Sequence, residues 1–169
     1  EATNCYRLLH GIAEDAPGLT VDRYGSLLLV QTFRTALDAD AVNELRDVAS
    51  AALDVPLEVV CNHRGREPDS PASHQPSAAA LEPHECTEGG VRFVIRGRHR
   101  GQDPWLFLDL RSGRRAVRTI AAGAAVLNLF AYTCGVGIVA AVAGAREVLN
   151  VDFAQSALDV GAENATRNG

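Results

Sequence analysis

The sequence predicts an α/β protein in two parts. Residues 1–98 are expected to form a small α+β domain of mostly antiparallel strands, and residues 99–169 the first half of a doubly wound parallel sheet. Short apolar runs separated by turn residues fill the first part. Strand-like and helix-like runs alternate in the second part. The 169 residues, 47% of them hydrophobic, are enough to fill both cores.

Three strand-like runs open the chain, at residues 6–10, 19–23 and 27–33. The sequence RYGS separates the second run from the third. Gly25 within it can take the positive φ that a tight turn needs. These two runs therefore predict a hairpin.

A helix is predicted over residues 38–53, where apolar residues recur at helical spacing and Asp38 or Asp40 can cap the N-terminus. Its apolar positions are Ala41, Val42, Leu45, Val48, Ala49 and Ala52. Two β-branched runs, residues 57–62 and 91–95, predict further strands. Between them, residues 63–84 hold four of the seven prolines and predict an irregular surface loop.

The second part predicts a βαβα order after a first helix at residues 109–121. Leu110, Ala116, Val117 and Ile120 are available to pack that helix. The following elements are a buried strand, a small-residue helix, a second strand and a last helix, at residues 125–129, 136–143, 147–151 and 154–167. This order predicts parallel strands joined by right-handed crossovers. Two strands are few for such a sheet, and the first residue is Glu1. We therefore expect a piece of a longer chain.

Composition excludes several classes of protein. No apolar run approaches the roughly 18 residues of a membrane span, and the N-terminus lacks a signal-peptide pattern, which predicts a cytoplasmic protein. The four cysteines form no C-x-x-C pair, as suits a reducing compartment. Four side chains could together offer zinc ligands if they lay on strands, but their spacing matches no common zinc motif, so no metal is predicted. They are Cys61, His63, His84 and Cys86.

Arginine is concentrated in one stretch. Residues 92–118 carry +6 while the whole chain carries −5. Their arginines are Arg92, Arg96, Arg98, Arg100, Arg111, Arg114, Arg115 and Arg118. The planar guanidinium group binds phosphate through paired hydrogen bonds. The stretch indicates a surface for a polyanion such as RNA, with a solvated face and the arginine bias of a GC-rich genome as the alternative.

The sequence NLFAYTCGVG, residues 128–137, predicts the ligand site, because ligands of such sheets bind beyond the C-terminal ends of the strands. The string that begins at Gly135 fits the dinucleotide pattern G-x-G-x-x-[GA]. However, five residues separate Leu129 from Gly135, whereas a dinucleotide loop brings its first glycine close to the strand. The longer loop favours a ligand without pyrophosphate, such as S-adenosylmethionine.

Asp152 ends the second predicted strand of this sheet. A carboxylate there can accept hydrogen bonds from both hydroxyl groups of a ribose. Either cofactor contains a ribose, so Asp152 does not discriminate between them. The alternative role, an N-cap of the following helix, is less favoured because Asp152 lies at the tip of the strand.

Four segments together resemble a known family. They are YRLLHGIAEDAPGLTVDRYG (6–25), GQDPWLFLDLRSGRR (101–115), VLNLFAYTCGVGIVAAVAGA (126–145) and VLNVDFAQSALDVGAENATRNG (148–169). They are similar to successive motifs of the bacterial 23S rRNA large-subunit methyltransferases, the cytosine-C5 and guanine-N7 enzymes. The resemblance implies a central α+β domain before a Rossmann-like, class I methyltransferase domain, S-adenosylmethionine as cofactor and ribosomal RNA as partner.

The resemblance also implies a cofactor site. Phe130, Tyr132, Thr133 and Gly135 would line the methionine side of the donor, next to Asn128. The implied roles of the remaining residues are adenine contact for Phe153, ribose binding for Asp152, and contact with the donor or the RNA backbone for Arg111. No catalytic residue is predicted within the chain, because the family places its acceptor-side residues after the fourth strand, beyond Gly169.

Three departures from the family pattern leave the modified base open. Cys134 replaces a usual glycine, Leu110 replaces a frequent glutamine, and residues 103–105 replace Lys-Thr-Gly. Methylation at cytosine C5 needs a thiolate. Cys134 lies in the predicted cofactor-binding loop, residues 130–137, here called the donor loop, and no residue near it in sequence could deprotonate its thiol. It is therefore not predicted as the nucleophile.

The predicted function is therefore S-adenosylmethionine-dependent RNA methylation, with the acceptor-side chemistry outside the chain. The alternatives are a nicotinamide-dependent oxidoreductase and a non-catalytic RNA-binding module with the same fold. Homodimerisation is left open, since a two-stranded parallel sheet leaves apolar faces uncovered.

Overall fold

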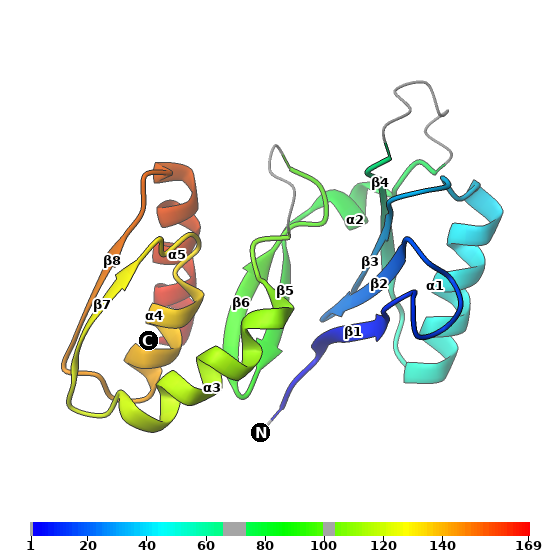
Figure 1. Cartoon of the computed structure of the whole chain (residues 1–169). Helices are drawn as coiled ribbons and strands as arrows, with labels where there is room; N and C mark the ends of the chain where they lie inside the picture. The colour runs from blue at the N-terminus through cyan, green and yellow to red at the C-terminus, as the bar shows by residue number, and fades with distance from the viewer. Residues whose placement is uncertain (1, 66–73, 100–103) are drawn as a thin grey trace. The chain divides into compact units, whose positions relative to one another are not determined.

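The computed structural model describes residues 2–65, 74–99 and 104–169 (Figure 1). Its first elements are β1 (Cys5–Leu9), β2 (Leu19–Tyr24), β3 (Leu27–Thr32), α1 (Ala39–Leu53), β4 (Glu58–His63), α2 (Ala78–Leu81), β5 (His84–Glu88) and β6 (Val91–Ile95). A short 3-10 turn then precedes α3 (Arg111–Ile120), β7 (Ala125–Leu129), α4 (Gly135–Val142), β8 (Glu147–Val151) and α5 (Gln155–Asn168). The predicted α/β fold class is confirmed.

The chain forms two compact units: an N-terminal unit of Asn4–Cys86 and Arg96–Gln102, and a C-terminal unit of Glu1–Thr3, Thr87–Ile95 and Asp103–Gly169. The N-terminal unit holds β1–β4, α1 and α2, and the C-terminal unit holds β6–β8 and α3–α5. The domain boundary expected after residue 98 remains a prediction. No helix in the described parts of the chain is long and apolar enough to cross a membrane.

The N-terminal unit contains one sheet in the order β1-β2-β3-β4. Its first two pairings are antiparallel and β3 pairs with β4 in parallel. The predicted hairpin is confirmed, because Tyr24 pairs with Leu27 across a turn in which Gly25 has a φ of 62°. A Cβ at Gly25 would also collide with the carbonyl oxygen of Glu85. The turn thus requires glycine both for its backbone and for its space.

Helix α1 begins where the sequence predicts, since the Asp38 Oδ1 accepts a hydrogen bond of 2.8 Å from the backbone N–H of Ala41. Its apolar stripe packs against the sheet through Val42, Leu45 and Ala49. Val48, predicted to lie in the stripe, is instead 62% exposed. Six residues at about 100° each place it about 120° around the helix from Val42, outside the buried stripe.

The loop predicted over residues 63–84 differs from the structure at both of its ends. Strand β4 extends to His63 and β5 begins at His84. Helix α2 lies inside the segment, and the Ser77 Oγ accepts a 3.0 Å hydrogen bond from Ala80 N–H at its start. Residues 66–73 lie outside the described residues.

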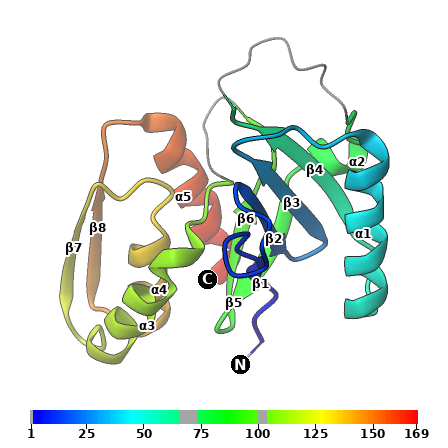
Figure 2. The same ribbon diagram turned by 45° about the vertical axis from the view of Figure 1, so that its right-hand side comes forward.

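In the C-terminal unit, β7 and β8 form a parallel pair in the predicted βαβα order. Figures 1 and 2 show α4 and α5 on one face of this pair. On the other face of the pair, every second side chain of β7 and β8 is exposed to solvent; Leu127 is 60%, Leu129 55% and Leu149 58% exposed. The prediction that the first strand is buried is therefore wrong for the described chain, because helix α4 covers only one face.

The apolar packing predicted for the first helix of this unit is also wrong. Leu110 is 49% exposed, Ile120 is 75% exposed, Ala116 is exposed and Val117 is only half-buried. The one buried side chain of α3 is Arg114, which is 2% exposed. Its partner is a carboxylate outside the helix, so a charge pair fixes α3 in place of an apolar stripe.

Candidate functional site

The loop between β7 and α4 holds the backbone in an unusual conformation. Phe130, Tyr132 and Cys134 have φ values of 56°, 50° and 62°. The left-handed region costs a residue with a side chain roughly 1–2 kcal/mol, so three such residues within five persist only if neighbouring contacts hold them. Backbone strain of this kind is concentrated at functional sites.

Hydrogen bonds to the end of β8 provide that support. Ala131 N–H donates to the Val151 carbonyl at 3.0 Å, and Tyr132 N–H donates to the Asp152 Oδ2 at 2.8 Å. The buried hydroxyl of Thr133 donates to the backbone carbonyl of Trp105. The loop is therefore fixed from two sides.

Asp152 joins the two strand ends through both of its carboxylate oxygens. Oδ2 accepts from Tyr132, and Oδ1 accepts from the Ala154 N–H at 2.9 Å. The backbone N–H groups of Ala154 and Tyr132 hold the pKa of this carboxyl below its usual range, so it is ionised at neutral pH. An ionised carboxylate has about four lone-pair positions, which leaves acceptor capacity for a ligand.

An exposed aromatic ring follows the end of each strand of the β7–β8 pair. Phe130 follows β7 and is 85% exposed, and Phe153 follows β8 and is 96% exposed. The rings of Tyr132 and Phe107 pack against each other at 5.6 Å between centroids. Exposed phenylalanines at strand ends offer apolar faces on which a flat ring can stack.

The two glycines of the loop motif have different roles. A Cβ at Gly137 would collide with the Asn150 amide, whose Cγ would lie only 2.9 Å away. A Cβ at Gly135 would meet nothing closer than Leu106 Cδ1, at 3.7 Å. Gly137 therefore permits close packing of α4 on β8, and Gly135 leaves space at the start of the helix.

The remaining predicted site residues point elsewhere. Asn128 donates from its side chain to Asn150 Oδ1 at 2.8 Å, on the side of the strands that α4 covers. Arg111 Nε binds the Glu88 Oε2 at 3.0 Å. The structure thus groups Phe130, Tyr132, Asp152 and Phe153 at the strand ends, with Gly135 at the start of α4.

Asn164 was missed from the sequence, although it supports the loop. It is 1% exposed, accepts a 2.8 Å hydrogen bond from Val94 N–H, and donates to the Thr133 carbonyl at 3.4 Å. The signal is its place in α5, because it continues a buried i, i+3, i+4, i+7 stripe. The stripe is Ala157, Val160, Gly161 and Asn164. A polar residue in such a stripe needs a partner.

Other candidates have no support as catalytic or metal sites. Burial, followed by the charge of Asp152, raises the pKa of the Cys134 thiol, which is the opposite of what a nucleophile requires. His63 pairs with Thr32 at 2.7 Å and His84 with Ser26 at 3.1 Å. Within the described ranges no three His, Cys, Asp or Glu side chains are placed to hold a metal ion.

Curated relatives match nearly the whole chain. The "Ribosomal RNA large subunit methyltransferase I" of Aeromonas hydrophila is 32% identical over 97% of the chain and 42% of its own length. The "Ribosomal RNA large subunit methyltransferase K/L" of Alteromonas mediterranea is 33% identical over 98% of the chain and 24% of its own length. The chain therefore spans less than half the length of these relatives.

A solved structure shares the same fold. The candidate methyltransferase SMU.776, complexed with SAH, superposes with a TM-score of 0.76 at 27% identity. The superposition covers 98% of the chain and 42% of SMU.776. A family model described as S-adenosylmethionine-dependent methyltransferase matches residues 6–169. The chain thus belongs to the S-adenosylmethionine-dependent methyltransferase family.

Proposed function

We propose that the chain binds S-adenosylmethionine at the ends of β7 and β8 and serves as the donor-binding part of a methyltransferase for large-subunit ribosomal RNA. One observation carries this proposal. The ionised carboxylate of Asp152 fixes a left-handed loop and keeps acceptor capacity, and an exposed aromatic residue, Phe130 or Phe153, follows each of the two strands. The names of the curated relatives support the RNA substrate, which in turn supports a cytoplasmic location.

The residues fit the cofactor in kind. Asp152 would accept hydrogen bonds from the ribose hydroxyls, and Phe153 would lie against the adenine. Phe130, Tyr132 and Gly135 would surround the methionine part. When bound, S-adenosylmethionine supplies an electrophilic methyl group. SMU.776, which matches the chain at 27% identity, is complexed with SAH, the product form of this cofactor.

Three predicted residues are proposed to act from behind the loop. Thr133 and Asn128 engage Trp105 and Asn150 rather than open space. Arg111 engages Glu88. We therefore propose that Thr133 and Asn128 position the donor loop, and that Arg111 helps to hold helix α3 in place through its pairing with Glu88.

Calorimetric titration with S-adenosylhomocysteine tests the proposal. Asp152→Asn keeps the shape of the side chain but removes its charge, so we expect binding to weaken about tenfold or more. Asp159→Asn is the matched control, because Asp159 is an exposed acid of α5 that accepts a hydrogen bond of 2.9 Å from the Gln155 side chain. Equal affinities for the two variants would contradict the proposed site.

The same titration with NAD separates the two cofactor classes. We expect no heat of binding with NAD, because the loop brings Gly135 to the helix only after five intervening residues. Tighter binding of NAD than of S-adenosylhomocysteine would favour an oxidoreductase.

A further inference from the structure

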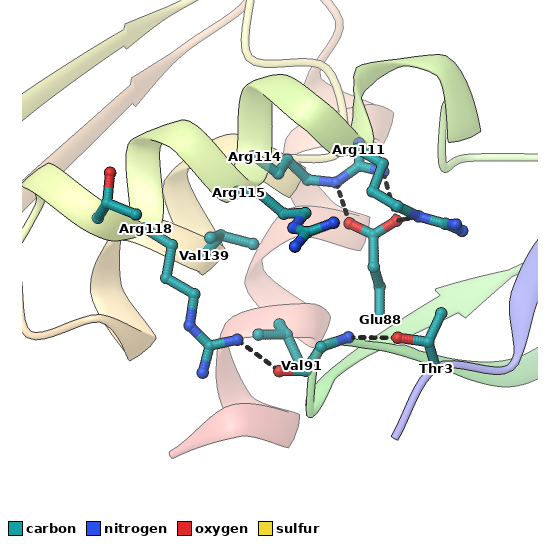
Figure 3. A pocket seen from close by; sticks show the side chains of 10 residues that line it. Thr3, Glu88, Val91, Arg111, Arg114, Arg115, Arg118 and Val139 are labelled. Carbon is teal, nitrogen blue, oxygen red and sulfur yellow. Dashed lines mark hydrogen bonds and ion pairs between the residues drawn. The ribbon is translucent and has the colours of Figure 1, made fainter. Parts of the chain in front are cut away.

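A pocket of about 510 Å³ lies in the C-terminal unit between α3 and the turn that joins β5 to β6 (Figure 3). None of its lining residues belongs to the donor loop or to the strand ends of β7 and β8. Its volume is that of an ordinary small-ligand site. The proposed cofactor function does not account for it.

Helix α3 lines this pocket with four arginines, Arg111, Arg114, Arg115 and Arg118. Their spacing of i, i+3, i+4 and i+7 places them on one face of the helix. Like charges at these spacings repel and destabilise a helix. The lining contains one carboxylate, Glu88, so the pocket carries a formal surplus of three positive charges.

Glu88 is already satisfied at the base of the pocket. Arg114 binds it through two hydrogen bonds, of 2.7 Å to Oε1 and 2.9 Å to Oε2, and Arg111 adds a third of 3.0 Å. The carboxylate and the Arg114 side chain are 6% and 3% exposed. Figure 3 shows the three side chains converging. This ion pair is structural, and it holds α3 at Glu88.

Arg115 remains for a ligand, and Arg118 lies beside it in the lining of the pocket. Arg118 Nη1 donates to the Gly89 carbonyl at 2.6 Å, which fixes its guanidinium at the edge of the pocket. Arg115 is exposed, and within the described residues no hydrogen bond or ion pair engages its guanidinium. In Figure 3 its head points into the pocket beside Glu88. An anion here would relieve the repulsion within α3.

We infer that this pocket binds a phosphate group of an RNA strand, an inference that rests on the proposed RNA substrate. Guanidinium groups bind phosphate in a planar, two-point geometry, and the Arg115 head points into this space (Figure 3). The volume exceeds that of one phosphate, and Val91 and Val139 add apolar surface for the attached nucleoside. Arg115 is the residue that binds the phosphate, and Arg118 is a neighbouring arginine held in place by the Gly89 carbonyl.

The test measures binding of a fluorescent single-stranded RNA by anisotropy over a salt series. Arg115→Gln should weaken binding about tenfold and reduce the slope of log K against log salt by about 0.7. Arg146→Gln is the matched control, since Arg146 is an exposed arginine of the same unit outside the pocket. The control should bind RNA with the parent affinity and slope.

Adenosine monophosphate serves as a competitor that separates the two sources of phosphate. It should displace the RNA only at much higher concentration than an unlabelled strand does. If the mononucleotide competes as well as RNA, or if both variants lose affinity equally, the inference is overturned. Titration of the parent protein and of each variant with S-adenosylhomocysteine separates this inference from the proposed function. If the parent protein does not bind S-adenosylhomocysteine, the proposed function is wrong. If it does, and Arg115→Gln leaves RNA affinity unchanged, only the inference about the pocket is wrong.

Discussion

The two units are filled in different ways. The N-terminal core consists of branched apolar side chains, among them Leu28, Val30 and Val42, clustered between the sheet and α1. In the C-terminal unit, small residues lie where α4 and α5 pack, and buried polar side chains join the elements. The small residues are Gly137, Ala140, Ala157 and Gly161, and the polar ones are Glu88, Arg114, Thr133 and Asn164.

This difference determines which substitutions each unit tolerates. Removal of methyl groups should damage the first unit, because large side chains fill it. Addition of methyl groups, or removal of a polar partner, should damage the second unit. In the C-terminal unit the backbones approach closely and the buried polar groups are paired. Both features hold the loop between β7 and α4 in one conformation.

The largest effect is expected from truncation in the N-terminal core. Leu28 in β3 is 0% exposed, and Leu28→Ala should lower the free energy of unfolding by about 3.5 kcal/mol. The matched truncation in β7, Leu127→Ala, starts from a side chain that is 60% exposed and should cost less than about 1 kcal/mol. Urea denaturation followed by circular dichroism measures both. Equal losses of unfolding free energy in the two variants would show that the two units do not differ in this way.

Next in size is the buried charge pair of the C-terminal unit. Arg114→Gln leaves the carboxylate of Glu88 with Arg111 alone and should cost about 3 kcal/mol. Arg46→Gln, at the exposed pair with Asp47, should cost less than about 1 kcal/mol. If Arg46→Gln lowers the free energy of unfolding as much as Arg114→Gln does, burial does not explain how much each ion pair contributes to stability.

The same pair predicts how stability depends on pH. Burial alone would raise the pKa of Glu88, but hydrogen bonds from Arg114 and Arg111 outweigh it and hold the pKa below the ordinary value of 4.5. A lowered pKa in the folded state stabilises it fully above 4.5, and this stabilisation is lost as the pH falls through the lowered value. Glu88→Gln should flatten the acid limb of a plot of unfolding free energy against pH. An unchanged limb would exclude Glu88 as its source.

The smallest of these effects distinguishes the two glycines of the loop motif. Gly137→Ala should cost about 2 kcal/mol, because the new methyl group collides with the Asn150 amide. Gly135→Ala has ordinary contacts and should leave thermal unfolding almost unchanged. It should instead weaken S-adenosylhomocysteine binding if the proposed site is correct. A larger loss of stability at Gly135 than at Gly137 would reverse these roles.

Local patterns were sufficient for most of the elements. The apolar runs predicted β1–β4 and β6–β8 within one or two residues, and Asp38 marked the start of α1. The glycine loop and Asp152 were correctly placed at the ends of β7 and β8. Their roles toward a cofactor remain predictions. These features depend on residues close together in the chain, which is why the sequence alone could indicate them.

Features that depend on distant partners were not predictable in the same way. The sequence predicted Arg114 as part of a surface for a polyanion, or of a solvated face, whereas it is buried against Glu88, which lies 26 residues earlier. The burial expected for β7 failed since an apolar run does not say which face is covered. The Oδ1 of Asn164 bonds across 70 residues to Val94. Arg100 and residues 66–73, part of the predicted polyanion surface and of the predicted loop, lie outside the described residues.

Cys134 and Gly161 constrain each other although 27 residues separate them in the chain. Cys134 has a φ of 62°, and its side chain occupies the space above Gly161, where a Cβ would collide with the Cys134 sulfur and lie 2.9 Å from its Cβ. Alanine at 161 therefore clashes for as long as position 134 carries cysteine. The residue at 134 thus decides which side chains position 161 can hold.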